Sequence, residues 1–189
     1  MELRSHLMDG IMNNQLESLT TAIYKRAPHG DIVAFVSSIL ELVLSENSLV
    51  VNNWHPLGFL QLKLGHTDSN VSVKLHVWPK MLRYPQKPSW LIHRHEWHLD
   101  SHMLYGKIKN EIYNVSRVEN QEEGTNKLYR VAFEGSSSIL KDTGKMVRCV
   151  LHSSTEYEAG QGYSVPVQSF HASMVPKAYL ASTLVLTQP

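Results

Sequence analysis

Histidines are concentrated in one short segment of this chain. The sequence holds 11 histidines in 189 residues, and four of them lie between His93 and His102. Neutral imidazole is a common ligand for divalent metal ions, so this segment is a candidate metal site. On a β-strand, His93 and His95 would share a face, and both could reach one ion at about 2.1 Å. A third ligand would then have to come from a neighbouring strand.

Two other interpretations of this segment stay open. On a helix, His95, His98 and His102 would share a face, but a zinc-protease helix needs His-Glu-x-x-His. Here Glu96 follows His95, and Leu99 stands where the second histidine is required. The proline-bounded, apolar start of the segment favours a strand. In the second interpretation the histidines are ordinary polar residues on a solvated face.

A second pattern further along the chain supports the metal interpretation. Residues 160–171 read G-x5-P-x-Q-x2-H, and residues 93–106 read H-x-H-x10-G. Together they resemble the two motifs of the cupin superfamily of small β-barrels, G-x5-H-x-H-x3/4-E-x6-G and G-x5-P-x-G-x2-H-x3-N. The resemblance extends over residues 49–187, which is most of the chain.

The chain departs from these motifs at several positions. Lys87 replaces the opening glycine of the first motif, and Leu99 occupies its glutamate position at the shorter spacing. The longer spacing selects Asp100, which would lie on the opposite strand face from the histidines unless a bulge turned it inward. In the second motif, Gln168 replaces the turn glycine and Val175 replaces the closing asparagine.

The resemblance therefore implies a metal site of three neutral histidines, His93, His95 and His171, without a carboxylate. Such a site is similar to that of the thiol dioxygenases, in which Fe(II) binds the substrate thiolate and O₂ together. Residues 101–106 and 171–176 also resemble the segments that follow the ligands in the plant cysteine oxidase and cysteamine dioxygenase branch, with one residue fewer after His95. The implied function is an Fe(II) dioxygenase for a small molecule, and zinc, manganese or nickel would also accept imidazole ligands.

Several side chains are candidates for the substrate pocket. Trp97 falls on the strand face of the two ligand histidines and would form a wall. Lys74 and His76 share one face of an earlier strand with Trp78, and they would meet a substrate carboxylate if that face is interior. In the alternative, Leu75 and Val77 point inward and the polar residues lie at the surface. The candidate substrate-binding residues are Trp97, His76, Lys74, Asn110 and Tyr113.

Hydrophobic spacing predicts helices first and strands afterwards. Apolar residues recur every three or four positions over residues 14–47, with a break at Pro28–Gly30 and Asp31 as the expected N-cap. After Ser48 the pattern alternates, which predicts an all-β cupin-type antiparallel barrel or jelly roll at 49–189 behind an N-terminal helical segment at 1–48. Polar loops are expected at 119–126 and 135–144. The predicted strands cover residues 59–64, 71–78, 90–95, 106–115, 128–133, 146–151, 163–167, 170–175 and 179–186.

Composition narrows the functional classes. A hydrophobic content of 42% can bury a full core, and a net charge of +1 does not favour nucleic acid as the main partner. No apolar run approaches the roughly 20 residues of a membrane span, so a membrane is not expected as a partner either. Cys149 is the single cysteine, which excludes a disulfide scaffold and a cysteine-based zinc site. We expect a cytoplasmic, homodimeric enzyme for a small-molecule substrate. Two alternatives stay open: a cupin isomerase, lyase or cyclase that uses zinc, manganese or nickel without O₂, and a non-catalytic ligand-binding cupin.

Overall fold

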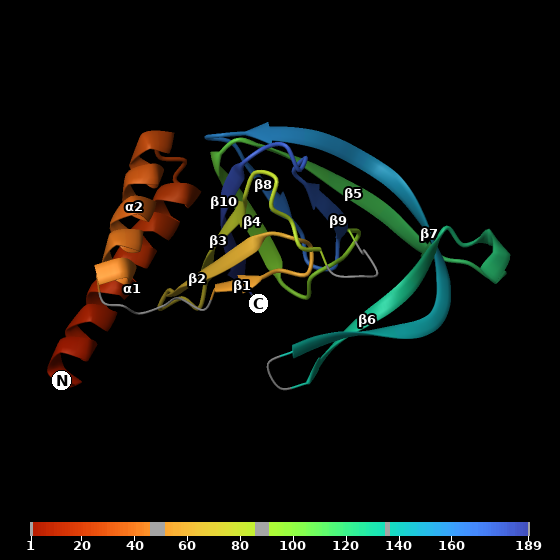
Figure 1. Ribbon diagram of the computed structural model, residues 1–189, viewed down its shortest axis with the longest axis horizontal. Helices are drawn as coiled ribbons and strands as arrows, with labels where there is room; N and C mark the ends of the chain where they lie inside the picture. Colours follow the sequence, from red (N-terminus) through yellow and green to blue (C-terminus); the bar gives the residue numbers. More distant parts are fainter. Residues whose placement is uncertain (1, 46–51, 86–90, 135–136, 189) are drawn as a thin grey trace.

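The structure is a computed structural model that describes residues 2–45, 52–85, 91–134 and 137–188. Two α-helices lie beside a pair of antiparallel sheets, and a long strand pair extends from the far side (Figure 1). The boundary expected between residues 48 and 49 and the motif position at Lys87 lie outside the described residues. None of the described helices is long and apolar enough to cross a membrane.

The N-terminal segment forms two helices, α1 (Glu2–Tyr24) and α2 (His29–Ser45). The first begins well before residue 14, where the apolar spacing becomes regular. The second begins at His29, so Asp31 lies in its first turn and is not the N-cap. Instead, the carbonyl of Pro28 accepts hydrogen bonds from the amides of Asp31 and Ile32. An acidic side chain in a first turn is still favourable there, because the helix N-terminus carries partial positive charge.

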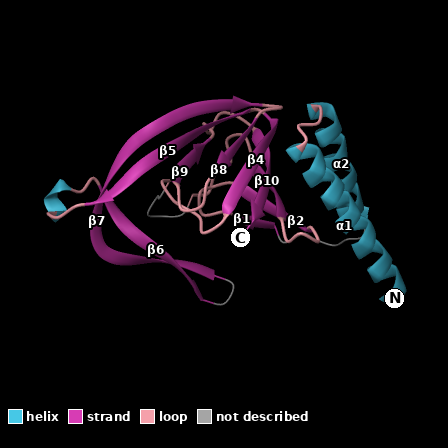
Figure 2. Ribbon diagram, turned by 180° about the vertical axis from the view of Figure 1, so that it is seen from behind, coloured by secondary structure: helices cyan, strands magenta, loops and turns pink. Residues whose placement is uncertain are grey.

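The strands pair into two sheets. One sheet has the order β1-β2-β3-β10-β4-β8, and the other has the order β6-β7-β5-β9. All pairings among the described strands are antiparallel, and the sheets curl around one another as a jelly roll (Figure 2). The strands are β1 (Asn52–Trp54), β2 (Leu60–His66), β3 (Ser72–Trp78), β4 (His98–Tyr105), β5 (Lys107–Arg117), β6 (Asn126–Glu134), β7 (Ser137–Glu158), β8 (Gly162–Val165), β9 (Phe170–Met174) and β10 (Ala181–Gln188).

The strand in the histidine-rich segment is β4, which begins after the strand predicted over residues 90–95 was expected to end. In β4, Leu99, Ser101 and Met103 alternate as buried residues, while the polar His98, Asp100 and His102 face the other way. This alternation was missed because the histidine-rich composition hides it. Residues 91–95 form no regular strand; they join the second sheet through a single bridge between His93 and His171.

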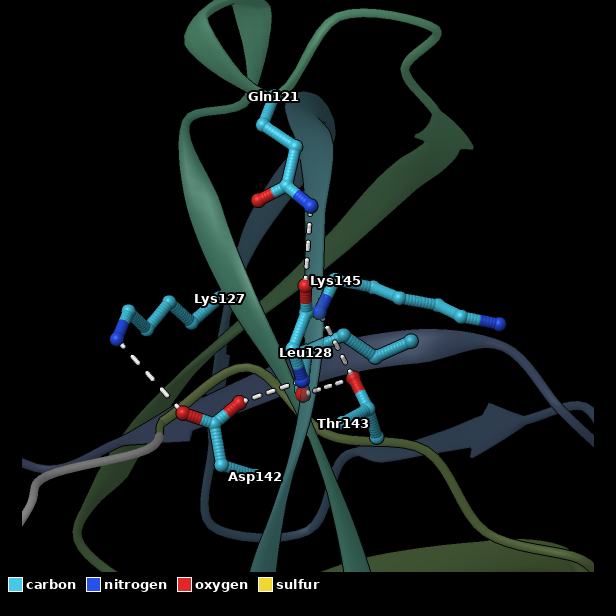
Figure 3. Close-up of polar contacts among 7 residues, drawn as sticks. Gln121, Lys127, Leu128, Asp142, Thr143 and Lys145 are labelled. Atoms are coloured by element: carbon cyan, nitrogen blue, oxygen red, sulfur yellow. Dashed lines mark hydrogen bonds and ion pairs between the residues drawn. The ribbon is translucent and has the colours of Figure 1, made fainter.

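Strand β7 passes through the segment expected to be a loop at 135–144. Its register against β6 shifts between Leu128 and Tyr129, so that Thr143 and Gly144 are extra residues on β7. Figure 3 shows this bulge: Thr143 Oγ1 donates to the Leu128 carbonyl at 2.5 Å, and Asp142 accepts from the Gly144 amide at 2.8 Å. The Asp-Thr-Gly turn signal therefore produces a bulge inside a strand rather than a connection between strands.

Strand β3 is covered on both faces. Val73 and Leu75 of β3 pack against α1 and α2 in a cluster that also holds Leu19 and Ile39. Because side chains alternate, Lys74 and His76 of the same strand point into the space between the sheets. The helices thus cover the apolar face of β3, and its polar face points into the barrel interior.

Candidate metal centre

The backbone brings two of the candidate ligands directly opposite each other. His93 and His171 exchange both backbone hydrogen bonds, at 2.9 and 2.8 Å. Directly paired residues on antiparallel segments present their side chains on one face, and the ring of His95 lies beside both of them. Between His93 and His171 the chain passes through strands of both sheets, so these paired residues lie far apart in the sequence.

The three imidazoles gather at one point between the sheets. Their ring centroids are 4.4 Å apart for His93 and His171, 4.8 Å for His93 and His95, and 5.3 Å for His95 and His171. One ring nitrogen of each lies within 4.8 Å of the other two. Nitrogens bound to one ion at about 2.1 Å lie roughly 3 to 3.5 Å apart, so small ring rotations would close the cluster.

Hydrogen bonds orient two of these rings. The Nδ1–H of His171 donates to Asn110 Oδ1 at 3.2 Å, and the Nδ1–H of His93 donates to the Leu91 carbonyl at 2.9 Å. Each bond selects the tautomer with an unprotonated Nε2, which is the form that binds a metal. His171 is only 3% exposed, and its Nε2 has no hydrogen-bond partner among the described residues. A buried nitrogen lone pair of this kind fits a metal ligand.

The environment keeps the cluster neutral. Burial, with the neighbouring His93 and His95 rings, lowers the pKa of His171 to about 2. Burial, with His93, His55 and Lys74, lowers the pKa of His95 to about 3. Burial also lowers the pKa of His93, against the opposing effect of its hydrogen bond to Leu91. Neutral imidazoles offer lone pairs, so no proton has to leave at neutral pH before a metal binds.

The turn before β9 positions His95 despite its unexpected residue. Gln168 occupies the glycine position of the second motif and adopts a left-handed backbone, with φ of 62°. Its amide donates to the His95 carbonyl at 2.8 Å, and the ring of His95 stacks on Trp97 with centroids 5.2 Å apart. The turn keeps the geometry for which the motif uses glycine, at the cost of some backbone strain in Gln168.

A cavity beside the cluster contains three of the five predicted substrate-binding residues. Lys74, His76 and Trp97 all line it. Asn110 does not; its side chain instead accepts from His171 Nδ1–H and, at 3.1 Å, from the Ser173 hydroxyl. Tyr113 does not line it either, because three residues along β5 place it on the face opposite Asn110, where it donates to Glu111 at 2.5 Å.

Sequence reasoning missed His55 as part of the cavity wall. Its ring stacks on Phe59 with centroids 4.3 Å apart, and burial, with His93 and Lys74, lowers its pKa to about 4. Burial also holds the pKa of His76 well below its usual value, and His76 Nε2 lies 3.2 Å from Gln61 Oε1. His55 lies in a Pro- and Gly-containing turn after β1, so no periodicity marks it as interior.

Other residues of the histidine-rich segment lie away from the cluster. Leu99 lines the cavity but offers no ligand atom, while Asp100 accepts from Ser164 at 2.5 Å on the opposite face of β4. His98 lies 3.2 Å from Asp100, and His102 lies 3.5 Å from His29 of α2. The alternation of β4 therefore points His98, Asp100 and His102 toward the outside of the barrel and Leu99 toward its interior.

Comparisons with known proteins add fold likeness only. No protein-family model matches the sequence, and neither does any curated protein. The DMSP lyase DddQ from Ruegeria pomeroyi DSS-3 matches with 13% identity and a TM-score of 0.46, over 81% of this chain and 63% of that one. Hydroquinone 1,2-dioxygenase PnpCD, in complex with Cd²⁺ and 4-hydroxybenzonitrile, matches with 9% identity and a TM-score of 0.38, over 67% and 62% of the two chains.

An RmlC-like cupin with a double-stranded β-helix fold from Methanocaldococcus jannaschii matches with 12% identity and a TM-score of 0.38, over 74% of this chain and 89% of that one. The chain spans only 63% and 62% of the lyase and the dioxygenase. With its two curled antiparallel sheets and a three-histidine cluster between them, the chain has a two-sheet jelly-roll fold.

Proposed function

We propose that His93, His95 and His171 bind a divalent metal ion and that the chain is a metal-dependent enzyme. One observation carries the proposal: three neutral imidazoles converge, and the buried Nε2 of His171 has no partner among the described residues. A buried acceptor without a hydrogen bond is unfavourable, and a metal ion would satisfy it. Asn110 and the Leu91 carbonyl would hold two of the ligand rings in the binding tautomer.

We further propose that the metal is Fe(II) and that the enzyme is a dioxygenase for a small thiol. The support is the resemblance of residues 93–106 and 160–171 to the three-histidine thiol dioxygenases. When bound, the metal would supply a Lewis-acidic centre that lowers the pKa of a thiol and activates O₂. The chain would contribute orientation through Trp97 and a largely apolar wall that limits water.

A second candidate is a lyase or isomerase that uses its metal without O₂. It is favoured by titratable side chains in the cavity that are not ligands, among them His55, His76 and Tyr163. A neutral imidazole can accept a proton from a substrate carbon, as such reactions require. In the dioxygenase these groups would only orient the substrate.

The test is metal analysis of protein purified without O₂, followed by O₂-uptake measurements on the iron-loaded protein with a panel of small thiols. We expect about one metal ion per chain and O₂ uptake that depends on the thiol. His171→Ala should lose the metal, whereas His102→Ala should keep it, because His102 faces α2. Wild-type protein that takes up no divalent metal would contradict the proposal. Metal binding without thiol-dependent O₂ uptake would favour the second candidate.

A further inference from the structure

The cavity beside the histidine cluster has a pronounced charge asymmetry. Of the described residues that line it, Lys74 is the only one with a formally charged side chain, and no carboxylate is among them. The cavity wall therefore carries one ammonium group and, among the described residues, no carboxylate to offset it.

The ammonium group of Lys74 is held in a defined place. Its Nζ donates to Thr187 Oγ1 at 3.3 Å and lies 5.7 Å from the centre of the Trp97 ring. Trp97 in turn stacks on His95. The cation and His95 therefore contact the same aromatic ring, and the hydrogen bond and the ring together limit the motion of the ammonium group.

Burying this cation is unfavourable without an anion. No ion pair joins Lys74 to a carboxylate in the part of the chain that the structure describes. Burial and the facing Lys63 on β2 both lower the pKa of Lys74, which shows that its charged form lacks compensation. A bound anion would supply that compensation.

We propose that Lys74 determines substrate class: it binds the carboxylate of a small organic acid whose other donor group meets the three histidines. This inference rests on the proposed function, since it places the second donor group at the metal. The cavity volume of about 90 Å³ has room for only a few water-sized groups, which favours a short acid. A single lysine suits a monoanionic carboxylate, whereas phosphate sites usually gather several donors.

Thr183 supplies a second polar contact on the same wall. Its Oγ1 is buried, lines the cavity and has no hydrogen-bond partner among the described residues. Thr183 pairs with His76 across the boundary between β10 and β3, two residues from the Lys74–Val185 pair. The hydroxyl can donate to an oxygen of the same bound acid.

The test compares two probes that differ only in charge. Mercaptoacetate and its uncharged amide, mercaptoacetamide, are titrated by calorimetry into Zn-loaded and metal-free protein. The variants are Lys74→Met, which keeps the length of the side chain without its charge, and Lys63→Met as the matched control. Lys63 lies directly opposite Lys74 on β2 but outside the cavity.

We expect wild-type protein to prefer mercaptoacetate over the amide, with or without metal. Lys74→Met should weaken mercaptoacetate binding about 10- to 100-fold, the range for loss of a charged hydrogen bond, and leave amide binding within about twofold. Lys63→Met should leave amide binding unchanged and weaken mercaptoacetate binding much less than Lys74→Met does, because Lys63 acts on the site only from outside the cavity. A Lys74→Met variant that keeps the carboxylate preference would overturn the inference, and so would wild-type protein without such a preference.

The two proposals can fail separately. Metal content of wild-type protein decides the proposed function, and the carboxylate preference of the metal-free protein decides the role of Lys74. Lys74→Met should retain the wild-type metal content, because Lys74 touches Trp97 and Thr187 rather than a ligand. Loss of metal in this variant would instead assign Lys74 to the metal centre and overturn the inference.

Discussion

At the scale of single residues, the side-chain amide of Asn110 orients one of the proposed metal ligands. Its oxygen accepts from both His171 Nδ1–H and the Ser173 hydroxyl, which in turn lies 3.3 Å from the Tyr163 hydroxyl. Because an amide oxygen only accepts, this contact selects the tautomer of His171. Asn110 is therefore a positioning residue for the proposed metal ligand.

Replacing Asn110 should weaken metal binding without removing a ligand. We expect Asn110→Leu to lower zinc affinity about 10- to 100-fold, because the His171 ring loses the bond that orients it. Asn110→Asp keeps an acceptor and should retain most of the affinity. Competition with a coloured chelator measures the effect, and Asn114→Leu, an exposed position on the same strand, is the control. Equal affinity in Asn110→Leu and wild-type protein would remove Asn110 from this role.

The buried histidines also make stability depend on pH. Burial lowers the pKa of His55 from 6.5 to about 4, so below pH 6.5 the unfolded chain binds more protons than the folded chain. The free energy of unfolding of the metal-free protein should be level above pH 6.5 and fall by up to about 3 kcal/mol toward pH 4 from this group. Urea unfolding across this range should show a shallower fall in His55→Gln. The exposed His66→Gln variant should keep the wild-type slope.

At the scale of elements, two glycines with left-handed backbones serve different purposes. Gly106 links β4 to β5 with φ of +75°, and a Cβ there would lie 2.4 Å from the Leu180 carbonyl oxygen. Gly144 forms the β7 bulge with φ of +67°, and a Cβ there would meet nothing within 4 Å. The first position needs glycine for both conformation and space, and the second for conformation alone.

Comparing alanine substitutions at Gly106 and Gly144 separates the cost of steric crowding from the cost of a left-handed backbone. Gly144→Ala should lower the free energy of unfolding by about 1 kcal/mol, the cost of a left-handed alanine. Gly106→Ala should lower it by about 3 kcal/mol, because β10 must also shift away from the new methyl group. Equilibrium urea unfolding of both variants gives the comparison. Equal losses would show that the contact with Leu180 relaxes freely.

At the scale of the whole molecule, the helices and the barrel share one core. Leu16 and Leu19 of α1 and Ile39 of α2 belong to the same buried cluster as Val73 of β3 and Leu184 of β10. Helices and barrel should therefore unfold in one cooperative transition. The expected homodimer, like the expectation that neither nucleic acid nor a membrane is a partner, stays a prediction from the sequence.

Two leucine substitutions test this shared core. Leu19 is 0% exposed between α1 and the sheet, whereas Leu44 of α2 is 76% exposed. Leu19→Ala should lower the free energy of unfolding of the whole chain by about 2 to 5 kcal/mol, through lost burial and the remaining cavity. Leu44→Ala should change it by less than about 0.5 kcal/mol. Far-ultraviolet circular dichroism and tryptophan fluorescence should report the same midpoint; separate midpoints would mean that the helices unfold independently.

What the sequence alone determined is what local patterns encode. Apolar residues every three or four positions predicted the helices, and alternation of apolar and polar residues predicted most strands. The resemblance to two motifs identified His93, His95 and His171 as one group of candidate ligands. Turn signals were less decisive, since the Asp-Thr-Gly of residues 142–144 produces a bulge when a paired strand lies beside it. The strand at His98–Tyr105 was missed because its outward residues are polar and its inward ones include Ser101.

Only the tertiary structure decided which side of each strand is interior. For β3, either face was compatible with the sequence; the helices cover Val73 and Leu75, and this leaves Lys74 and His76 to the cavity. The roles of Asn110 and His55 also depend on contacts between segments far apart in the chain, such as the hydrogen bond between Asn110 and His171, which are 61 positions apart. Periodicity describes how one segment alternates, but burial and hydrogen bonding depend on the segment packed against it, and no local pattern contains that information.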